Sequence, residues 1–227
     1  EALVSDLCPV TPEMLLGRDP VASMDGLLKR NITGQSVLVT GAGGSIGAEL
    51  CTQILAQRPS KIILFEISEF ALFRINDDLL KALKTLKSET SIVPVIGSVR
   101  DEKLVAKTIK THGVNTIYHA AAYKHVPLVE QNVVEAINNN VLGTLTMVRT
   151  AAELGVENFT LISTDKAVRP TNVMGASKRV AELICQAYAA EETKTKFCMV
   201  RFGNVLGSSG SVIPHFQKQI EAGGPVT

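Results

Sequence analysis

The 227-residue sequence predicts an α/β protein in which a parallel sheet carries helices on both faces. Short apolar runs, such as Val37–Val39 and Ile62–Phe65, alternate with longer segments in which apolar residues have helical spacing. Ile46, Leu50 and Ile54 show that spacing directly after the first run. This alternation of strands and helices is typical of a doubly wound parallel sheet, the Rossmann fold.

A glycine turn joins the first predicted strand to the first predicted helix. Gly41 allows the tight turn, Gly44 leaves room for a pyrophosphate, and Gly47 lets the helix pack close to the strand. The helix begins with Ser45 and Ile46, and its N-terminus offers N–H groups and a positive dipole end to phosphates. Strand, glycine turn and helix in this order predict a dinucleotide site. The alternative is a tight turn without a ligand.

The overall composition argues against several classes of function. The formal net charge of +1 gives no reason to expect contact with nucleic acid or with an anionic membrane surface. Cys8, Cys51, Cys185 and Cys198 lie far apart, which fits a reducing compartment and packing roles, and no metal site is expected. No apolar run reaches the ~18 residues of a membrane helix, so this stretch is expected to be soluble. Because the sequence begins at Glu1 rather than at Met, we expect a fragment of a longer protein.

The sequence divides into a lead, residues 1–35, and a nucleotide-binding domain, residues 36–227. Three prolines break the lead into short pieces, and Leu27–Arg30 is expected to close a short helix. We interpret the lead as a linker that packs against the edge of the domain and has a structural role.

The second predicted strand, Lys61–Phe65, ends at Glu66, about 20 residues beyond the glycines. An acid at this place binds the ribose hydroxyls of the adenosine and repels the additional phosphate of NADP. Glu66 therefore favours NAD as the cofactor. Arg58 and Arg74 lie nearby in the sequence and leave NADP open. A further alternative is that Glu66 is a solvated acid at a strand end.

An amphipathic helix is expected next, with an apolar face formed by Leu72, Ile75, Leu79, Leu83 and Leu86. The third predicted strand, Ile92–Ile96, leads into a loop in which Ser98 and Val99 are the candidates to flank the adenine. The alternative is a plain strand-to-helix loop in which Asp101 is the N-cap of the following helix.

The fourth predicted strand, Asn115–His119, opens into small residues. Ala120 and Ala121 would let the backbone lie against the cofactor at the carboxyl edge of the sheet, where ligands bind in doubly wound folds. In the polar segment that follows, Lys124 could meet a phosphate and His125 could titrate near neutrality. Both residues could equally be solvated loop residues.

The fifth predicted strand, Phe159–Ile162, delivers Ser163, Thr164, Asp165 and Lys166 to the same edge. A hydroxyl, an acid and a base in succession are suited to proton transfer. The alternative is a turn that is closed by pairing of Asp165 with Lys166.

The sixth predicted strand, Phe197–Arg201, leads into a loop rich in glycine and serine that contains Asn204 and Ser208. Such a loop can surround a pyrophosphate with backbone N–H groups. A last helix is expected at residues 213–222. Earlier in the chain, Asn138–Asn140 predicts a local kink in a helix, because asparagine amides compete with backbone hydrogen bonds.

Together these segments resemble the bacterial UDP-N-acetylglucosamine 4,6-dehydratases of the polysaccharide-biosynthesis type, which are extended short-chain dehydrogenases. The resemblance covers residues 36–227 and is carried by Thr40–Gly47, Phe65–Phe70, Lys124–Pro127, Ser163–Ala167, Asn172–Lys178 and Arg201–Ser208. It implies NAD as the cofactor and UDP-N-acetylglucosamine or a related UDP-sugar as the substrate. It also implies a longer protein at the cytoplasmic face of the bacterial inner membrane, with most of the C-terminal substrate domain outside this sequence, and it allows a homo-oligomer.

The resemblance implies an internal redox cycle. A hydride leaves sugar C4 for NAD, the 4-ketone acidifies C5, water is lost across C5 and C6, and the hydride returns to C6. Lys166 is then expected as the base at C5, Asp165 as the acid for the C6 hydroxyl, and Lys178 as the cation that holds the nicotinamide ribose. The residues expected to bind the substrate are Lys124, His125, Asn204 and Ser208.

The sequence departs from the superfamily pattern at one catalytic position. Met174 and Lys178 lie one helical turn apart, where members usually have tyrosine and lysine, and methionine cannot carry a proton. Our hypothesis is that Thr164 takes the C4 hydroxyl proton, with Asp165 or a water. The resemblance also implies that Asn140 holds a water or backbone group near the lysine.

Two other functions stay open at this point. A nucleotide-sugar 4-epimerase shares the oxidation at C4, but it needs no acid and base at C5 and C6. A non-catalytic NAD-binding module is supported by Met174 and opposed by the complete segment from Ser163 to Lys166.

Overall fold

The computed structural model describes residues 24–191, 193–205 and 212–226. In this part of the chain, six parallel strands form one sheet in the order β3-β2-β1-β4-β5-β6. The strands are β1 (Ser36–Thr40), β2 (Lys61–Glu66), β3 (Ser91–Ile96), β4 (Thr116–His119), β5 (Asn158–Thr164) and β6 (Lys196–Phe202). β2 and β3 are added on one side of β1, and β4, β5 and β6 are added on the other side. This change in the order of strands at β1 and β4 is the doubly wound arrangement. The predicted fold class is confirmed.

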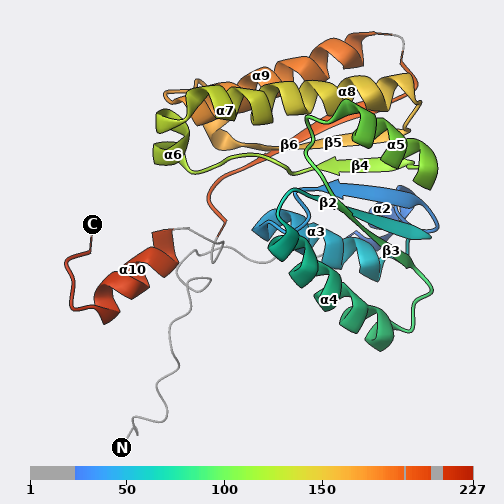
Figure 1. Ribbon diagram of the computed structural model, residues 1–227, viewed down its shortest axis with the longest axis horizontal. Coiled ribbons are helices and arrows are strands. Elements are labelled where there is room, and N and C mark those ends of the chain that lie inside the picture. The colour runs from blue at the N-terminus through green and yellow to red at the C-terminus, as the bar shows by residue number, and fades with distance from the viewer. Residues whose placement is uncertain (1–23, 192, 206–211, 227) are drawn as a thin grey trace, which may run out of the picture.

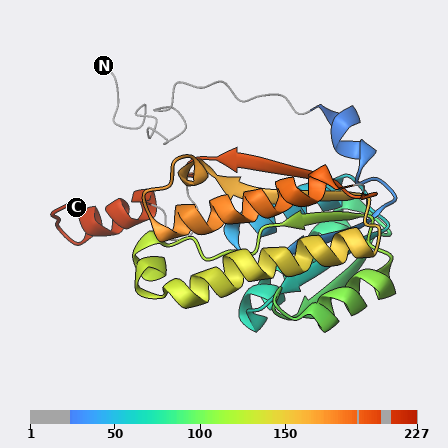
Figure 2. The same ribbon diagram turned by 90° about the horizontal axis from the view of Figure 1, so that it is seen from above.

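Helices cover both faces of this sheet, with α3 and α4 on one face and α5, α8 and α9 on the other (Figures 1 and 2). The helices are α2 (Asp25–Arg30), α3 (Ser45–Ala56), α4 (Glu69–Leu86), α5 (Glu102–His112), α6 (Val126–Gln131), α7 (Val133–Ile137), α8 (Gly143–Glu153), α9 (Val173–Ala190) and α10 (Val212–Glu221). A π-helix, η2 (Asn138–Leu142), and a 3-10 helix, η3 (Asp165–Ala167), complete the described elements.

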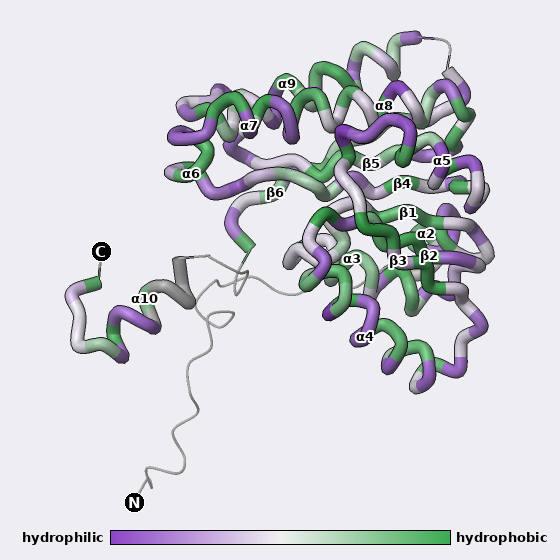
Figure 3. Tube along the Cα trace, viewed as in Figure 1, coloured by the Kyte–Doolittle hydropathy of each residue, from purple (hydrophilic) through white to green (hydrophobic). Residues whose placement is uncertain are grey.

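The core of the described residues consists of one large apolar cluster on each face of the sheet and a small third cluster of Val129, Ala136 and Met174. Val37 and Val39 pack with residues of α3 and α4, whereas Leu38 packs with residues of α5, α8 and α9. Neighbouring residues of one strand therefore supply opposite clusters, as the alternation of side chains requires. The central strands are accordingly hydrophobic, and hydrophilic residues gather on the outside of α5 (Figure 3). Burial on both faces explains why these strands are continuous apolar runs.

The amphipathic helix α4 agrees with its predicted apolar face except at its last turn. Leu72, Ile75 and Leu79 are buried, but Leu86, which was expected on that face, is exposed. Leu86 is the last residue of the helix, and the next residue, Lys87, adopts a left-handed conformation that ends it. The prediction for Leu86 is therefore wrong.

The predicted short helix of the lead is present as α2, but its leucines are exposed. Contact with the domain comes instead from the residues that follow, because Ile32 is buried and the carbonyl of Asn31 accepts a hydrogen bond from Thr116 Oγ1 (2.9 Å). The domain boundary at residue 35 stays a prediction. Across the described ranges, no helix has the length and apolar content to cross a membrane, and no group of three or more His, Cys, Asp or Glu could hold a metal ion.

The three consecutive asparagines interrupt the helical pattern between α7 and α8, as predicted. They begin the π-helix η2, in which the N–H of Gly143 donates to the carbonyl of Asn138. One turn is thereby widened, and single π-helical turns of this kind often lie at functional sites. The turn places Asn140, which is buried, between the loop after β4 and helix α9.

Candidate active site

Packing requires three glycines of the turn, Gly41, Gly43 and Gly47, and leaves Gly44 open; a Cβ on Gly43 would lie 2.5 Å from the Cβ of Ala71. Gly41 has a φ of 63°, and a Cβ there would lie 2.8 Å from the backbone of Ala121. A Cβ on Gly47 would overlap the carbonyl of Gly41. At Gly44 the nearest described atom, the Gly41 carbonyl oxygen, would be 3.3 Å from a Cβ. Gly44 is also the N-cap of α3 without a side-chain cap, so the start of α3 suits a phosphate.

Glu66 is tied to the backbone around the turn. It is 8% exposed, and its carboxylate accepts hydrogen bonds from the N–H groups of Gly43 (3.0 Å), Ile67 (2.9 Å) and Ser68 (3.0 Å). The alternative of a solvated acid is therefore wrong. Glu66 fixes the glycine turn against the start of α4, and its contact with a ribose stays a prediction.

A cavity of about 260 Å³ lies beside Glu66, and Ser98 and Val99 line it together with Ile67 and Gly97. Both of the predicted roles for this loop are compatible with the structure. The loop reaches a cavity of suitable position for an adenine, and Asp101 caps α5 by accepting from the N–H of Leu104 (3.0 Å).

The segment after β4 separates two larger cavities. Ala120, Lys124 and His125 line both a cavity of about 460 Å³ that extends from the glycine turn to α7, and a cavity of about 290 Å³ that extends to α9. The N–H of Ala121 donates to Thr40 Oγ1 (3.2 Å), which holds this backbone against the end of β1. Lys124 and His125 are exposed, so both can reach a ligand in either cavity.

Asn140 joins the segment after β4 to helix α9, as the resemblance implied. Its Oδ1 accepts from the N–H of Tyr123 (2.8 Å), and its Nδ2 donates to the carbonyl of Tyr123 (3.0 Å) and to Ser177 Oγ (3.0 Å). Ser177 in turn donates to the carbonyl of Met174 (2.7 Å). Asn140 therefore holds the backbone of Tyr123 directly and the carbonyl of Met174 through Ser177, and both Tyr123 and Met174 line the cavity of about 290 Å³.

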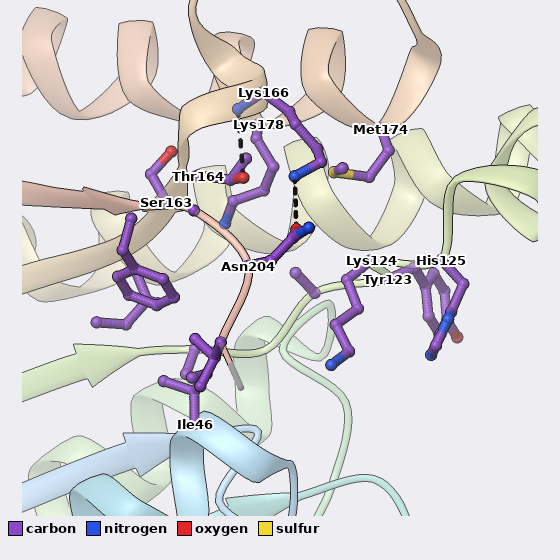
Figure 4. Close-up of a pocket in the computed structure, with 16 residues that line it drawn as sticks. Ile46, Tyr123, Lys124, His125, Ser163, Thr164, Lys166, Met174, Lys178 and Asn204 are labelled. Carbon is purple, nitrogen blue, oxygen red and sulfur yellow. Dashed lines mark hydrogen bonds between the residues drawn. The ribbon is translucent and has the colours of Figure 1, made fainter. Parts of the chain in front are cut away.

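The cavity of about 290 Å³ brings together most of the predicted catalytic residues (Figure 4). Thr164 and Lys166 come from the end of β5, and Met174 and Lys178 come from α9. Lys124 and His125 lie on the opposite side of the cavity (Figure 4). Ile46, Ile162, Phe202 and Val205 add apolar surface.

Lys178 is 5% exposed, and its side chain lines this cavity. Among the described residues, its amino group has no hydrogen-bond partner, although Glu182 and Cys185 interact with it electrostatically. Burial lowers the pKa of Lys178 to about 8, because a buried ammonium loses its hydration. A buried amino group without a hydrogen bond, at the wall of a cavity, suits a ligand that offers hydroxyls.

Asp165 and Lys166 form an ion pair, as in the alternative prediction of a turn closed by their pairing. Lys166 Nζ donates to Asp165 Oδ1 (3.2 Å) and to Asn204 Oδ1 (3.0 Å; Figure 4 shows the second bond). Thr164 Oγ1 also donates to Asp165 Oδ1 (3.0 Å). The hydrogen bonds from Lys166 and Thr164 lower the pKa of Asp165. Asn204 thus contacts a predicted catalytic residue, and Ser208 lies outside the described residues.

Sequence reasoning missed His119, which is fully buried behind the cavity. Its Nδ1 is 2.7 Å from Thr40 Oγ1, and its Nε2 is 3.0 Å from Thr144 Oγ1. Thr144 uses its proton to donate to the carbonyl of Asn140 (2.7 Å), so it must accept from His119 Nε2–H. Burial, and then the charge of Lys178, lower the pKa of His119 to about 3. This neutral tautomer links β1, β4 and α8.

Sequence reasoning also missed Glu182, which is fully buried one helical turn after Lys178. The available signal was an acid at helical spacing on the same face as Met174 and Lys178. A charged residue on a buried face requires partners, and these partners could not be named from the sequence.

The chain is similar to several curated proteins. It is 49% identical to the capsular polysaccharide biosynthesis protein CapD of Staphylococcus aureus, over the whole of this chain and 37% of that protein. It is 36% identical to a UDP-glucose 4-epimerase of Rickettsia canadensis, over 85% of this chain and 55% of that protein. It is 34% identical to a UDP-N-acetylglucosamine 4,6-dehydratase (inverting) of Campylobacter jejuni, over 84% of this chain and 55% of that protein. The chain thus spans between about a third and about half of these relatives.

Solved structures show the same fold. Pen from Bacillus thuringiensis superposes with a TM-score of 0.76 at 33% identity, over 84% of this chain and 58% of that chain. DesIV, a dTDP-glucose 4,6-dehydratase from Streptomyces venezuelae solved with NAD and TYD bound, gives a TM-score of 0.70 at 25% identity, over 84% of this chain and 63% of that chain. The family described as polysaccharide biosynthesis protein matches residues 37–227, and the chain therefore belongs to this family.

Proposed function

We propose that this chain is the nucleotide-binding and catalytic part of an NAD-dependent enzyme that modifies a nucleotide sugar for bacterial surface polysaccharide. The specific reaction we propose is the 4,6-dehydration of UDP-N-acetylglucosamine. The main support for this proposal is that one cavity is lined by Thr164, Lys166 and Lys178. Asp165 is hydrogen-bonded to both Thr164 and Lys166. The names of the relatives, which include a dehydratase of this substrate, support it.

The described residues fit NAD. Gly44 leaves the start of α3 open, and the cavity beside Glu66 offers space next to Ser98 and Val99. Lys178 has a buried amino group without a hydrogen bond among the described residues. When bound, NAD would accept the hydride from sugar C4 and return it to C6. The acid at Glu66 supports NAD over NADP because the carboxylate would repel an additional phosphate.

Proton transfer at C4 is assigned to Thr164 and Asp165. Met174 occupies the place of the usual tyrosine, and its thioether cannot carry a proton. Thr164 Oγ1 already donates to Asp165 Oδ1 at 3.0 Å. Thr164 can therefore accept the C4 hydroxyl proton while it passes its own proton to Asp165. This relay leaves Asp165 protonated, which is the form that an acid needs.

The elimination then uses Asp165 and Lys166 on neighbouring atoms. Asp165 gives its proton to the C6 hydroxyl, which leaves as water, and Lys166 takes the proton from C5. After the hydride reaches C6, Lys166 returns the proton to C5, so the sugar has lost one water in total. Lys166 can act as a base only when neutral, and cover by bound substrate would favour that form because burial disfavours an ammonium.

The experiment that tests the proposal follows the sugar itself. Full-length protein is incubated with UDP-N-acetylglucosamine in D2O and the products are examined by proton NMR and mass spectrometry. Loss of one water, deuterium at C5 and a new C6 methyl group support the dehydratase. An unchanged mass with inversion at C4 would establish a 4-epimerase, which the names of several relatives keep as the second candidate. An unchanged sugar would contradict both.

Two wider predictions concern the longer protein. Attachment to the cytoplasmic face of the inner membrane and assembly into a homo-oligomer both follow from the resemblance alone. Cell fractionation and the mass of the full-length protein in solution would test them.

A further inference from the structure

A cluster of charges lies beside the candidate active site, centred on the buried Glu182 of α9; the side chains of its two arginines, Arg179 and Arg201, are 37% and 38% exposed. Glu182 is 0% exposed and its carboxylate accepts four hydrogen bonds. Ser163 Oγ (2.6 Å) and Arg201 Nε (2.7 Å) donate to Oε1, and Arg201 Nη2 (2.6 Å) and Arg179 Nη1 (3.1 Å) donate to Oε2. A buried carboxylate is stable only with such partners, so these hydrogen bonds fix its position.

The partners of Glu182 belong to the two strands that end in the site. Ser163 of β5 and Arg201 of β6 are directly paired in the sheet register. Ser163 immediately precedes Thr164, Asp165 and Lys166, and Arg201 lies just before Gly203 and Asn204. One carboxylate therefore ties α9 to both strand ends, across which Lys166 and Asn204 are hydrogen-bonded at 3.0 Å.

Glu182 also lies one helical turn from Lys178 on the same buried face of α9. Although burial opposes its ionisation, the hydrogen bonds from Arg201, Ser163 and Arg179 lower the pKa of Glu182 to about 2. It is therefore a permanent negative charge. Its interaction with Lys178 raises the pKa of that lysine against the stronger effect of burial.

Other charged and titratable groups also lie around α9, and one of them, Cys185, also raises the pKa of Lys178. His119 of β4 is neutral, and Cys185 of α9 is a thiol whose pKa burial raises to about 12. Arg201 of β6 and Arg179 of α9 are cations that oppose a charge on Lys178. Several groups on neighbouring elements form pairs or bind backbone, among them Asp165 with Lys166, Arg149 with Glu102, Arg100 with Glu135, and Glu130 with the N–H of Val173.

We infer that Glu182 is a positioning residue of this site, because its buried carboxylate joins α9 to the ends of β5 and β6 and places a negative charge one helical turn from Lys178. Lys178 is the group proposed to hold the cofactor, and its positive charge would then depend on a residue that touches neither cofactor nor substrate. The inference takes its functional meaning from the proposed function, but its test does not require any reaction.

The test measures the titration of Lys178 directly. The protein is labelled with 13C at lysine Cε, and the Lys178 resonance is followed against pH by NMR in the unaltered chain and in Glu182→Gln. We expect the midpoint of Lys178 to move to lower pH in Glu182→Gln, because the glutamine is close in shape but carries no charge. An unchanged midpoint would overturn the inference.

Arg179→Gln is the matched control, because it also removes one hydrogen bond of the cluster. Both variants should lower the thermal midpoint of unfolding, yet Arg179→Gln removes a cation and should leave the Lys178 midpoint unchanged or raise it. If the Lys178 midpoint moved to lower pH by the same amount in both variants, the cause would be a general loss of packing around α9. This result would contradict a role for the charge of Glu182.

A third variant keeps the test decisive if Glu182→Gln does not fold. Arg201→Gln leaves the carboxylate with one cation fewer, and we expect it to raise the Lys178 midpoint. A Lys178 midpoint that falls or stays constant in Arg201→Gln would contradict an effect of the Glu182 charge on Lys178. Because the titration uses neither substrate nor cofactor, its result is independent of whether the proposed dehydration is correct.

Discussion

At the scale of single residues, the proposed mechanism replaces the usual tyrosine with two residues that are already hydrogen-bonded to each other, Thr164 and Asp165. Met174 is buried against Val129 and Ala136, so it fills space where a tyrosine would present a hydroxyl. Thr164, on the neighbouring strand end, has its hydroxyl 3.0 Å from Asp165. The proton transfer that one tyrosine performs in the superfamily is thus assigned, in our proposal, to Thr164 and Asp165 together.

This assignment predicts the effect of Thr164→Val. The substitution keeps the shape of the side chain and removes the hydroxyl, so we expect the rate of hydride transfer to fall by a factor of about 10²–10⁴, the usual contribution of a general acid or base. NADH formation in a single turnover of the full-length protein with the UDP-sugar measures this step.

Thr160→Val is the control for that change. Thr160 lies on the same strand, and its hydroxyl is 3.1 Å from Cys198 Sγ, away from the proposed chemistry. Turnover close to that of the unaltered protein is expected for this variant. The same result for Thr164→Val would remove Thr164 from the mechanism.

At the scale of elements, two helices end in the same way with different residues. α4 ends at Lys87, with a φ of 47°, and α5 ends at Gly113, with a φ of 58°. The left-handed conformation strains a residue with a side chain but does not strain glycine. The Lys87 side chain is exposed and takes no part in an ion pair with the described residues.

We therefore predict that Lys87→Gly raises the free energy of unfolding by about 0.5–1 kcal/mol. Gly113→Ala is the reverse change at an equivalent position, where a Cβ would have no described atom within 4 Å, and it should lower the free energy of unfolding by a similar amount. Urea unfolding measures both values. A loss of stability in Lys87→Gly would show that strain at this helix end is not the controlling quantity.

The elements themselves could be predicted from the sequence because each one has a local cause. Val37–Val39 is apolar since both faces of β1 are buried, whereas in β5 Phe159 and Leu161 are buried on one face and the other face is half-buried. The observed strands extend the predictions by only one or two residues at each end. The partners of Glu66, Asn204 and Glu182 could not be predicted, because the register of neighbouring strands and the path of the turns determine them. Local pattern locates a side chain at the edge of the sheet, and tertiary packing selects its partner there.

At the scale of the whole molecule, His119 connects stability to acidity. It is neutral in the folded chain, with a pKa lowered from 6.5 to about 3. Between these two values the unfolded chain binds more protons than the folded chain, so the free energy of unfolding must fall as the pH falls through this window. The full loss is on the order of 5 kcal/mol.

We predict that His119→Gln, which has no titratable group at this position, loses less of its stability between pH 6.5 and pH 5 than the unaltered chain. Glu182 does not interfere in this range, because its lowered pKa affects stability only below its ordinary value of 4.5. Urea unfolding at several pH values provides the comparison. Equal slopes for the two proteins would contradict the assignment to His119.

The loops that line the described cavities lie at one edge of the sheet. This arrangement affects how related enzymes can diverge in function. The two large apolar clusters lie within the layers of helices and strands, whereas the cavities are lined by residues at the ends of the six strands of the sheet and by residues of α6, α7 and α9. Substitutions in these loops can therefore change the reaction while the scaffold persists. A UDP-glucose 4-epimerase and a UDP-N-acetylglucosamine 4,6-dehydratase are accordingly about equally similar to this chain, at 36% and 34% identity. Overall sequence identity therefore does not distinguish the two reactions. The residues of the loops at this edge of the sheet are the ones that would determine which reaction each protein catalyses.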